Sequence, residues 1–400
     1  MNIIFLTLVR IENIDDPSIY HDLMRKFRDE GHQVYIVCPV ERRLGMNTTL
    51  VENNGVKILN VKTLNVQKTN VVEKGLGTIL LEGQFKRAIK KYLNDVKFDL
   101  ITYSTPPITL TNVVKYLKKR NPQAITYLQL KDIFPQNAVD IEMFSKGSLF
   151  YKFFRKKEKA LYKASDYIGC MSPANVEFVL KHNPEIARER VEVAPNSVEL
   201  SPTDEGRCKK EDVRNKYDLP TDKPIFIYGG NLGKPQGIPF LIECLNANAN
   251  RNDCHFLVIG TGTELPRLKA WYEDKKPQSV TVMNGLPKAD YDQLVKACDV
   301  GLIFLDHRFT IPNYPSRLLS YLENKMPVLC ATDPNTDMGR IAEENGYGYW
   351  CESVKPEDFT ELVDRMLASD RKVMGEKGYQ FLKENYLVEH TYNAFMRHWA

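Results

Sequence analysis

The feature that most restricts the fold of this chain is a regular alternation of short apolar segments with longer amphipathic ones. The chain begins with the apolar segment "NIIFLTL", followed by the helical pattern "SIYHDLMRKFRDEGH" and a second apolar segment, "QVYIVCPV". Strands that alternate with helices of about 10–15 residues are typical of βαβ units. The alternation therefore predicts an α/β protein with parallel, doubly wound sheets.

The alternation occurs twice, and a polar segment separates the two rounds. Residues 201–222 contain prolines and little apolar periodicity, so we expect them to be an interdomain linker. A chain of 400 residues exceeds the roughly 250–300 at which one hydrophobic core usually stops growing. We therefore expect a first Rossmann-like domain over 1–200 and a second over 223–379. One long helical pattern covers about 371–399, and we expect its last part, about 380–400, to cross back to the first domain.

The composition argues against several other classes of protein. Hydrophobic residues make up 43% of the chain and charged residues 26%, which is ordinary for a globular protein. The sequence has no run of about 18 uncharged apolar residues, and its start lacks the features of a secretory signal. Eight cysteines are scattered without a CxxC pair. We therefore expect reduced, mostly buried thiols in a cytoplasmic protein, not a disulfide framework or a zinc site.

Glycines follow strands in the second half of the chain but not in the first. The first strand leads into "TLVRIENIDD", so the GxGxxG loop of a dinucleotide-binding domain is absent there. In the second half, the first two strands lead into "YGGNLGKPQG" and "IGTGTE". Glycines before a helix N-terminus expose backbone N–H groups that favour phosphate, and Lys234 would add a mobile positive charge. A plain strand-to-helix turn with an exposed lysine is the alternative.

Several segments match, in order, the motifs of one enzyme family. The matching segments of the first half are "GHQVYIV", "KDIFP", "YKASDYIGCMSP" and "VAPNSVE". Those of the second half are "YGGNLGKPQG", "FLVIGTGTE", "VMNGLPKADYDQLVKACDVGLI" and "YPSRLLSYLENKMPVLC". Over nearly its whole length the chain resembles glycosyltransferase family 4, in particular the bacterial branch that builds capsule and O-antigen units by transferring N-acetylated aminosugars from UDP carriers. The resemblance implies the GT-B fold, in which two Rossmann-like domains face a cleft.

The resemblance implies that the second domain binds a nucleotide sugar and that the first binds the acceptor. Arg317 occupies the position of a basic residue under the donor diphosphate, where a guanidinium can grip phosphate oxygens in a bidentate way. An ordinary surface arginine at a helix start is the alternative. The candidate nucleotide-sugar-binding residues are Gly229, Gly230, Asn231, Gly233, Lys234, Gly260, Gly262, Leu286, Ser316, Arg317, Ser320 and Glu323. The candidate catalytic residues are Asp132, Lys234 and Arg317.

The chain departs from the family pattern at several polar positions. Asn231 and Gln236 stand where the glycine-rich loop of the family commonly has an arginine and a lysine. Pro312 and Ser320 stand where the family has two glutamates, the second of which typically holds the ribose hydroxyls. Glu323 lies one helical turn after Ser320, so it could reach a similar space or could be a solvated helix residue.

One acidic residue of the first half is a candidate for acceptor chemistry. Asp132 follows a predicted strand in "LQLKDIFPQNAVD". In the resemblance to the family, Lys131 stands at the position of the family's histidine, and Asp132 stands at the position of its acidic residue. Asp132 could accept the proton of the acceptor hydroxyl or orient the sugar. An aspartate that caps the next turn is the alternative.

We expect no metal site and no cofactor beyond a nucleotide sugar, UDP-linked, as the donor substrate. Asp290 and Asp292 in "ADYDQ" imitate the DxD metal motif of the other large glycosyltransferase fold. They fall at the start of an amphipathic pattern, where acidic residues complement the helix dipole, so we expect capping. The seven histidines include no HxxxH or HExxH pair.

Positive charge is concentrated in the first half. Between Gln84 and Lys163 there are seventeen Lys or Arg residues and six Asp or Glu residues. The segment "KGSLFYKFFRKKEKALYK" interleaves aromatic and basic side chains, which favours a helix that lies in an anionic headgroup layer. Solvated helix faces around a core aromatic stripe are the alternative. Nucleic acid would also suit the charge, but no recognition motif accompanies it.

These features together favour a metal-independent glycosyltransferase, peripheral at the inner face of the cell membrane, with a polyprenyl-diphosphate-linked acceptor. Retention of configuration at the sugar is implied by the resemblance alone. Two alternatives stay open. A GT-B-fold UDP-sugar 2-epimerase would need no lipid acceptor, and a non-catalytic scaffold would explain the missing glutamates and histidine.

Overall fold

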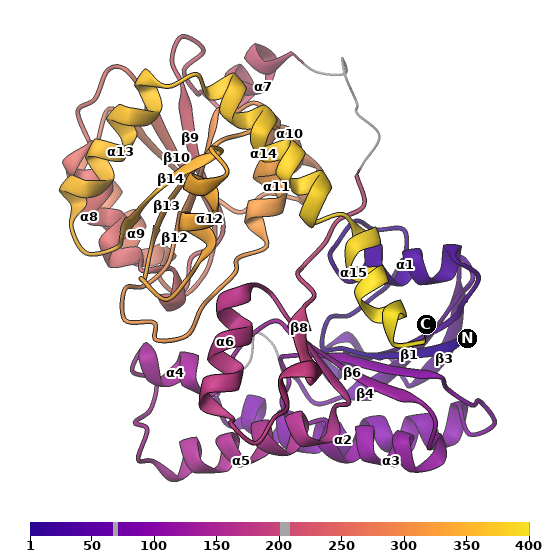
Figure 1. The fold of residues 1–400 in the computed structure, drawn as a ribbon. Helices are drawn as coiled ribbons and strands as arrows, with labels where there is room; N and C mark the ends of the chain where they lie inside the picture. Colours follow the sequence, from indigo (N-terminus) through magenta and orange to yellow (C-terminus); the bar gives the residue numbers. More distant parts are fainter. Residues whose placement is uncertain (67–70, 201–208, 400) are drawn as a thin grey trace. The chain divides into compact units, whose positions relative to one another are not determined.

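The computed structural model describes residues 1–66, 71–200 and 209–399, which form two compact units (Figure 1). The first unit comprises Met1–Glu199 together with Leu387–Ala400, and the second comprises Leu200–Tyr386. Each unit has one sheet of mostly or wholly parallel strands, with helices packed against it. The predicted α/β class with parallel, doubly wound sheets is therefore confirmed.

The first unit contains an eight-stranded sheet in the order β3-β4-β2-β1-β5-β6-β7-β8. Its strands are β1 (Asn2–Leu6), β2 (Gln33–Glu41), β3 (Thr49–Asn53), β4 (Val56–Thr63), β5 (Leu100–Ser104), β6 (Ile125–Leu130), β7 (Tyr167–Cys170) and β8 (Val191–Val193). Neighbouring strands are parallel, except that β3 and β4 are antiparallel. Strands such as β1 and β5 are buried on both faces of the sheet, which explains why their sequences are apolar without alternation.

Helices pack against this sheet on both faces (Figure 1). They are α1 (His21–Asp29), α2 (Val71–Tyr92), α3 (Thr111–Arg120), α4 (Gln136–Asp140), α5 (Leu149–Ala164), α6 (Pro173–His182), α15 (Val388–Met396) and the short helices η1 (Arg42–Leu44), η2 (Arg188–Arg190) and η4 (Arg397–Trp399). Helix α5 begins after Ser148, because the Ser148 hydroxyl accepts a hydrogen bond from the backbone N–H of Tyr151. Helix α3 packs against both α2 and α5, so these three helices form one layer.

The end of the chain differs from the single long helix that the sequence predicts over 371–399. The structure has two helices there, α14 (Arg371–Asn385) and α15, and Leu387 between them is extended. The backbone N–H of Val388 donates to the carbonyl of Val198, which ties the start of α15 to the first unit. On α15, Phe395 then stacks on Tyr127 with ring centroids 3.8 Å apart.

The second unit contains a six-stranded, wholly parallel sheet in the order β11-β10-β9-β12-β13-β14. Its strands are β9 (Ile225–Asn231), β10 (His255–Thr261), β11 (Val280–Asn284), β12 (Val300–Phe304), β13 (Val328–Thr332) and β14 (Gly348–Glu352). Its helices, besides α14, are α7 (Lys210–Lys216), η3 (Lys234–Gln236), α8 (Ile238–Ala247), α9 (Leu265–Lys275), α10 (Lys288–Lys296), α11 (Arg317–Glu323), α12 (Met338–Glu344) and α13 (Pro356–Ala368).

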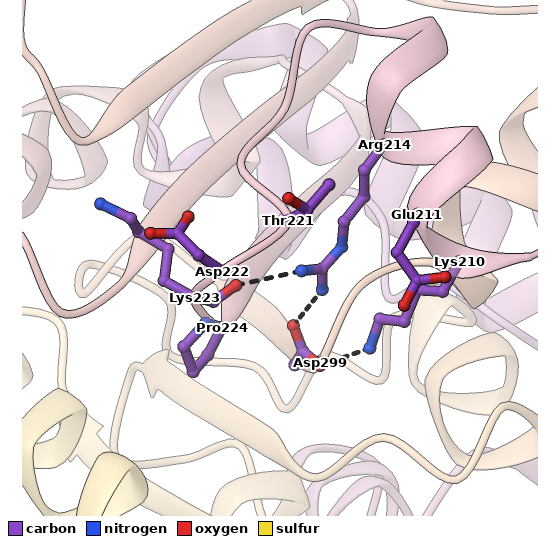
Figure 2. Close-up of a pocket in the computed structure, with 8 residues that line it drawn as sticks. All are labelled: Lys210, Glu211, Arg214, Thr221, Asp222, Lys223, Pro224 and Asp299. Atoms are coloured by element: carbon purple, nitrogen blue, oxygen red, sulfur yellow. Dashed lines mark hydrogen bonds and ion pairs between the residues drawn. The ribbon is translucent and has the colours of Figure 1, made fainter.

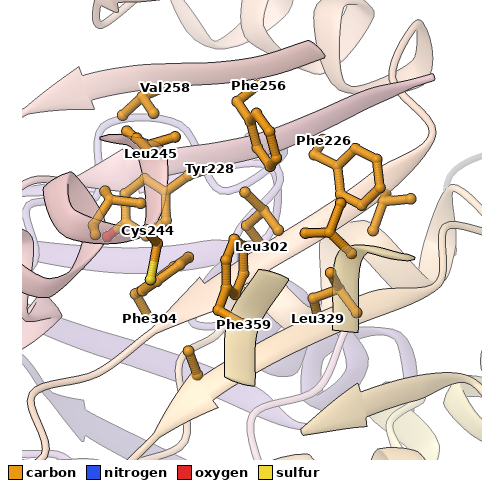
Figure 3. Packing of buried hydrophobic residues seen from close by; sticks show 14 of the residues in the cluster. Phe226, Tyr228, Cys244, Leu245, Phe256, Val258, Leu302, Phe304, Leu329 and Phe359 are labelled. Atoms are coloured by element: carbon orange, nitrogen blue, oxygen red, sulfur yellow. The ribbon is translucent and has the colours of Figure 1, made fainter. Parts of the chain in front are cut away.

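The core of the second unit fixes the strand from which the glycine-rich loop departs. Aromatic side chains from β9, β10, β12 and α13 meet between the sheet and its helices (Figure 3). Phe304 lies 5.1 Å from Phe359 and 6.2 Å from Tyr228, measured between ring centroids. Tyr228 is completely buried in the middle of β9, so the residues that follow it start from a rigid position.

Other sequence expectations agree with the structure less closely. Strand β3 has no counterpart in the predicted elements, because four of its five residues are exposed and give no apolar pattern. The segment expected to be a linker contains helix α7, which packs against α10. The seven cysteines in the described part of the chain are free and buried.

Replacement of Phe395 should destabilise the first unit, because Phe395 is fully buried between Tyr127 and Phe27. We expect Phe395→Ala to lower its free energy of unfolding by about 3–5 kcal/mol, the usual cost of truncating a buried phenylalanine. Urea denaturation read by hydrogen exchange of β1 and β6 measures the change. Phe150→Ala is the control, since 70% of Phe150 is exposed. Equal effects of the two substitutions would contradict the packing role of α15.

Candidate functional site

The glycine-rich loop of the second unit joins β9 to α8. Strand β9 ends at Asn231, η3 follows, and α8 begins directly after Gly237. Gly230 has a φ of 121° and Gly237 a φ of 58°, which are backbone conformations that residues other than glycine rarely adopt. These two glycines therefore let the chain turn from the strand into the helix.

A second glycine loop, after β10, packs directly against the first. A Cβ atom at Gly260 would lie 1.9 Å from the carbonyl oxygen of Gly230, and a Cβ at Gly262 would lie 2.2 Å from that of Leu232. The backbone N–H of Leu232 also donates to the carbonyl of Thr261 at 2.8 Å. Gly260 and Gly262 are thus required by the contact between two backbones, and this contact holds the first loop in place.

Arg317 lies beside the first loop with part of its guanidinium unpaired. Arg317 is the first residue of α11, and its guanidinium stands 4.3 Å from the centroid of the Tyr228 ring. Its Nη2 donates to Oε1 of Gln236 at 2.9 Å, whereas its buried Nη1 has no hydrogen-bond partner in the described part of the chain. A Cβ at Gly230 would lie only 3.7 Å from Nη2. A buried charged donor without a partner is costly, so this geometry suits an anion that binds at the loop.

The two polar residues that replace the family's cations have different environments. Asn231 is exposed, whereas Gln236 is half-buried and binds Arg317. The hydroxyl of Tyr228 also donates to Oε1 of Gln236, at 3.3 Å. Lys234, the first residue of η3, is exposed and has no side-chain partner among the residues that the structure describes. Gln236 therefore positions Arg317, and Lys234 is free to move toward a bound anion.

The remaining candidates of the second unit lie on α11 or at the carboxyl edge of the sheet. Ser316 is exposed and immediately precedes α11, while Ser320 and Glu323 are half-buried about one and two turns after Arg317. Leu286 is half-buried in the connection from β11 to α10. Gly229 packs against Tyr291, whose hydroxyl would lie 2.0 Å from a Cβ at that position, and Gly233 is buried before η3.

The acids that imitate a metal motif are engaged by lysines. Asp290 accepts a hydrogen bond from Nζ of Lys216 at 2.8 Å, and Asp292 accepts one from Nζ of Lys288 at 2.8 Å. Asp290 lies in the first turn of α10, where an acid complements the helix dipole. In the described ranges no group of three or more His, Cys, Asp and Glu side chains is arranged to hold a metal ion.

A cavity of about 260 Å³ in the second unit is lined by charged residues, several of which form ion pairs with one another (Figure 2). Nη2 of Arg214 and Nζ of Lys210 both bind the carboxylate of Asp299 at 2.5 Å. Arg214 also donates to the carbonyl of Lys223 at 3.1 Å. Arg214 and Lys210 are thus engaged in joining α7 to the sheet, so the glycine-rich loop with Arg317 is the better candidate for an anion site.

In the first unit, Asp132 is held just after the end of β6. The hydroxyl of Thr105 donates to the carbonyl of Asp132 at 3.1 Å, and the amide of Asn137 donates to its Oδ1 at 2.7 Å. Burial raises the pKa of Asp132 to about 6, although the bond from Asn137 acts in the opposite direction. At neutral pH the carboxylate is ionised and close to the point at which it can accept a proton.

Comparison with known proteins places both units in one class. Residues 19–202 match the family model described as Glycosyltransferase Family 4, and residues 209–381 match the one described as Glycosyl transferases group 1. The fold matches solved glycosyltransferases, including a sucrose-phosphate synthase from Thermosynechococcus elongatus (14% identity, TM-score 0.75, 99% of this chain and 98% of that one). The first half of the chain is thus similar to one glycosyltransferase family model and the second half to another, and the fold is that of GT-B glycosyltransferases.

Particular relatives refine this comparison. The probable glycosyltransferase WbjE of Pseudomonas aeruginosa is 24% identical over 267 residues, which are 65% of this chain and 64% of WbjE. The putative colanic acid biosynthesis glycosyl transferase WcaI of Escherichia coli K12 is 28% identical over 155 residues, 38% of this chain and 36% of WcaI. The matches span less than two thirds of either relative. Anabaena HepE, solved in complex with UDP, has 13% identity and a TM-score of 0.68, with 99% of both chains covered.

The residues that hold Arg317 cannot be recognised from the sequence alone. Tyr228 supplies the ring beneath the guanidinium, and Gln236 supplies its hydrogen-bond acceptor. A tyrosine immediately before the glycine-rich loop was visible in the sequence, but its contact with a residue 89 positions later depends on the sheet order. In the sequence, Gln236 differs from the family pattern, but nothing there shows that it contacts Arg317.

The pKa of Asp132 generates a prediction about stability. A carboxyl group whose pKa is raised by folding stabilises the protein below its unfolded pKa of about 4 and loses that contribution as the pH rises through about 6. We therefore expect Asp132→Asn to gain stability relative to the parent protein between pH 4.5 and pH 7. Urea denaturation at the two pH values measures this change.

Asp166 provides a control of opposite sign. Burial alone would raise its pKa, but hydrogen bonds from Lys118 and Thr126 outweigh burial and lower the pKa. Asp166→Asn should therefore lose stability relative to the parent as the pH rises from below 4 to 7. Parallel behaviour of the Asp132 and Asp166 variants would contradict the assigned pKa of Asp132.

Proposed function

We propose that this protein is a retaining glycosyltransferase that moves an N-acetylated aminosugar from a UDP-sugar to a polyprenyl-diphosphate-linked acceptor in capsule or O-antigen synthesis. The observation that carries the proposal is the unpaired, buried Nη1 of Arg317 beside the glycine-rich loop of the group 1 domain. The relatives WbjE and WcaI carry glycosyltransferase names, and WcaI is named for the synthesis of a polysaccharide. Anabaena HepE and an Escherichia coli trehalose-6-phosphate protein were solved with UDP or UDP-2-fluoro glucose.

The second unit supplies positive charge to the leaving group. When the bond between the sugar and the diphosphate breaks, negative charge increases on the phosphate oxygens. Arg317 is oriented beforehand by Tyr228 and Gln236, so it can stabilise this charge without reorganisation. Lys234 can approach the same oxygens from the exposed side of the loop. Because these cations take the role that a metal ion has in other enzymes, we propose that transfer is metal-independent.

The first unit binds the acceptor in this proposal. Asp132 orients the acceptor sugar or accepts the proton that its hydroxyl loses, and its pKa of about 6 suits either role at neutral pH. Retention of configuration rests on the family likeness. Lys131 replaces the histidine of the family pattern, so the residue beside Asp132 carries different chemistry in this chain.

We propose that the first unit docks reversibly on the inner face of the cell membrane, where the lipid-linked acceptor would reside. On α5, Leu149, Phe150 and Phe153 are 82%, 70% and 43% exposed, while exposed lysines alternate with them. The neighbouring Phe154 is instead half-buried and packs against Phe134. The described part of the chain contains no helix that is long and apolar enough to cross a membrane. An apolar patch with a basic border is suited to a shallow position among anionic headgroups.

Arg317 and Lys234 should contribute strongly to turnover. We expect Arg317→Met to lower turnover about 10²-fold or more, the scale for loss of a preorganised charge-stabilising group, and Lys234→Ala to act in the same direction. UDP affinity measured by calorimetry should fall in parallel. Arg365→Met is the matched control, because Arg365 also stacks on a tyrosine, Tyr349, at 4.1 Å. Normal turnover and UDP affinity in the Arg317 and Lys234 variants would refute the site.

Membrane docking should depend on both parts of the α5 surface. We expect Phe150→Ser with Phe153→Ser to abolish sedimentation with phosphatidylglycerol vesicles, because the apolar anchor is lost. Lys152→Gln with Lys156→Gln should weaken binding about tenfold or more, since each basic residue near an anionic surface contributes about 1 kcal/mol.

A pair of exposed lysines on the other unit is the control for charge. Lys372→Gln with Lys377→Gln changes the net charge equally on α14 and should leave vesicle binding unaltered. Phosphatidylcholine vesicles should bind the parent protein weakly. Equal loss in the two lysine pairs would show that net charge, and not the α5 surface, governs association.

A further inference from the structure

Lys131 lies at the carboxyl edge of the first sheet, directly after β6, and its ammonium group forms no ion pair with the described residues. Its Nζ is 2.5 Å from Oδ1 of Asn196 and 4.9 Å from the centroid of the Tyr20 ring. Its backbone N–H donates to the hydroxyl of Thr105 at 3.0 Å, which holds the backbone at this position. The described residues place no carboxylate within 4.0 Å of Nζ, so the ammonium group has only neutral partners.

An ammonium group in this position has unused capacity for binding. It carries three N–H donors, of which Asn196 accepts one, and the Tyr20 ring offers a weak attraction for the charge. Burial lowers the pKa of Lys131 to about 7, because neither partner compensates the charge. A negatively charged ligand at Nζ would supply the missing compensation and the missing acceptors.

We infer that Lys131, Asn196 and Tyr20 form a subsite for an oxyanion of the acceptor. The ligand is either the linking diphosphate or a carboxylate of an acidic acceptor sugar, since both present oxygens that accept from an ammonium group. The inference rests on the proposed function, which assigns the acceptor to the first unit. It adds a specificity-determining residue, Lys131, to the catalytic candidate Asp132.

The subsite has a defined dependence on pH. Only the protonated ammonium binds an anion well, so affinity follows the protonated fraction of Lys131. This fraction falls from about one half at pH 7 to about one hundredth at pH 9, which predicts affinity about 50-fold weaker at the higher pH. Asp132, with a pKa of about 6, is already ionised over this range, and burial raises the pKa of Tyr20, so its phenol stays protonated.

The test titrates the full chain by calorimetry at pH 7 and pH 9 with UDP present in excess, so that the site in the second unit is filled. One probe is N-acetylglucosamine joined through a diphosphate to a short prenyl chain, whose diester phosphates keep their charge over this range. The other probe is glucuronate. Binding of the first probe with the predicted pH dependence identifies the linking diphosphate, and such binding of the second identifies a sugar carboxylate.

Two substitutions separate charge recognition from structural effects. Lys131→Met keeps an unbranched side chain that is shorter by one atom, and it should weaken binding of the recognised probe at least tenfold at pH 7, with the pH dependence removed. Asn196→Asp keeps the lysine but pairs it internally, and it should also lose affinity. Lys57→Met is the matched control, because Lys57 in the same unit also stands over a tyrosine ring, that of Tyr35, at 5.2 Å.

The outcomes distinguish this inference from the proposed function. If both probes bind the Lys131→Met protein as tightly as the parent at pH 7, the subsite does not exist, whatever the enzyme transfers. Equal losses in the Lys131 and Lys57 variants would likewise overturn it. Failure of the parent protein to bind UDP, by contrast, would refute the donor site on which the proposed function stands.

Discussion

The arrangement of the second unit depends on one charged group that is held without a full set of partners. The Arg317 guanidinium is stacked on Tyr228 and bound to Gln236, yet its Nη1 is buried and unpaired. Desolvating a donor of this kind opposes folding, and the surrounding packing must offset that cost. The core around Tyr228 and the backbone contact between Gly230 and Gly260 supply this support. A preorganised anion site requires a donor that is held in this way, because the guanidinium is then already oriented before a phosphate binds.

The first unit also contains buried ionisable groups whose charges are only partly compensated by their neighbours. Lys131 and Asp132 are adjacent in the chain, but burial shifts both groups toward their neutral forms, to pKa values of about 7 and about 6. The two groups therefore change charge within a narrow range around neutral pH. A carboxylate that can take a proton and an ammonium that can take an anion are complementary features for an acceptor with a hydroxyl and a negative charge.

The sequence predicted the fold well where burial is continuous and poorly where contacts are distant. The apolar runs of β1 and β9 and the polar break between the domains were sufficient for the α/β class and for two parallel sheets. Strand β3 is mostly exposed, so its sequence has no apolar pattern that predicts a strand. The interruption between α14 and α15 was not predicted either, because there Leu387 pairs with Val198, which is distant in the sequence. Arg317 was found through its place in a motif. Its anchor Gln236 was not, because that contact is created only when β9 and α11 come together in the fold.

The central claim is that the protein joins a sugar from a nucleotide donor to a lipid-linked acceptor. Its most direct test incubates the protein with a panel of nucleotide sugars and prenyl-diphosphate-linked acceptors, and reads the products by mass. The account predicts an acceptor that is heavier by one sugar residue, together with an equal amount of released UDP. An epimerised donor with unchanged acceptor, or no change in any donor, would contradict it.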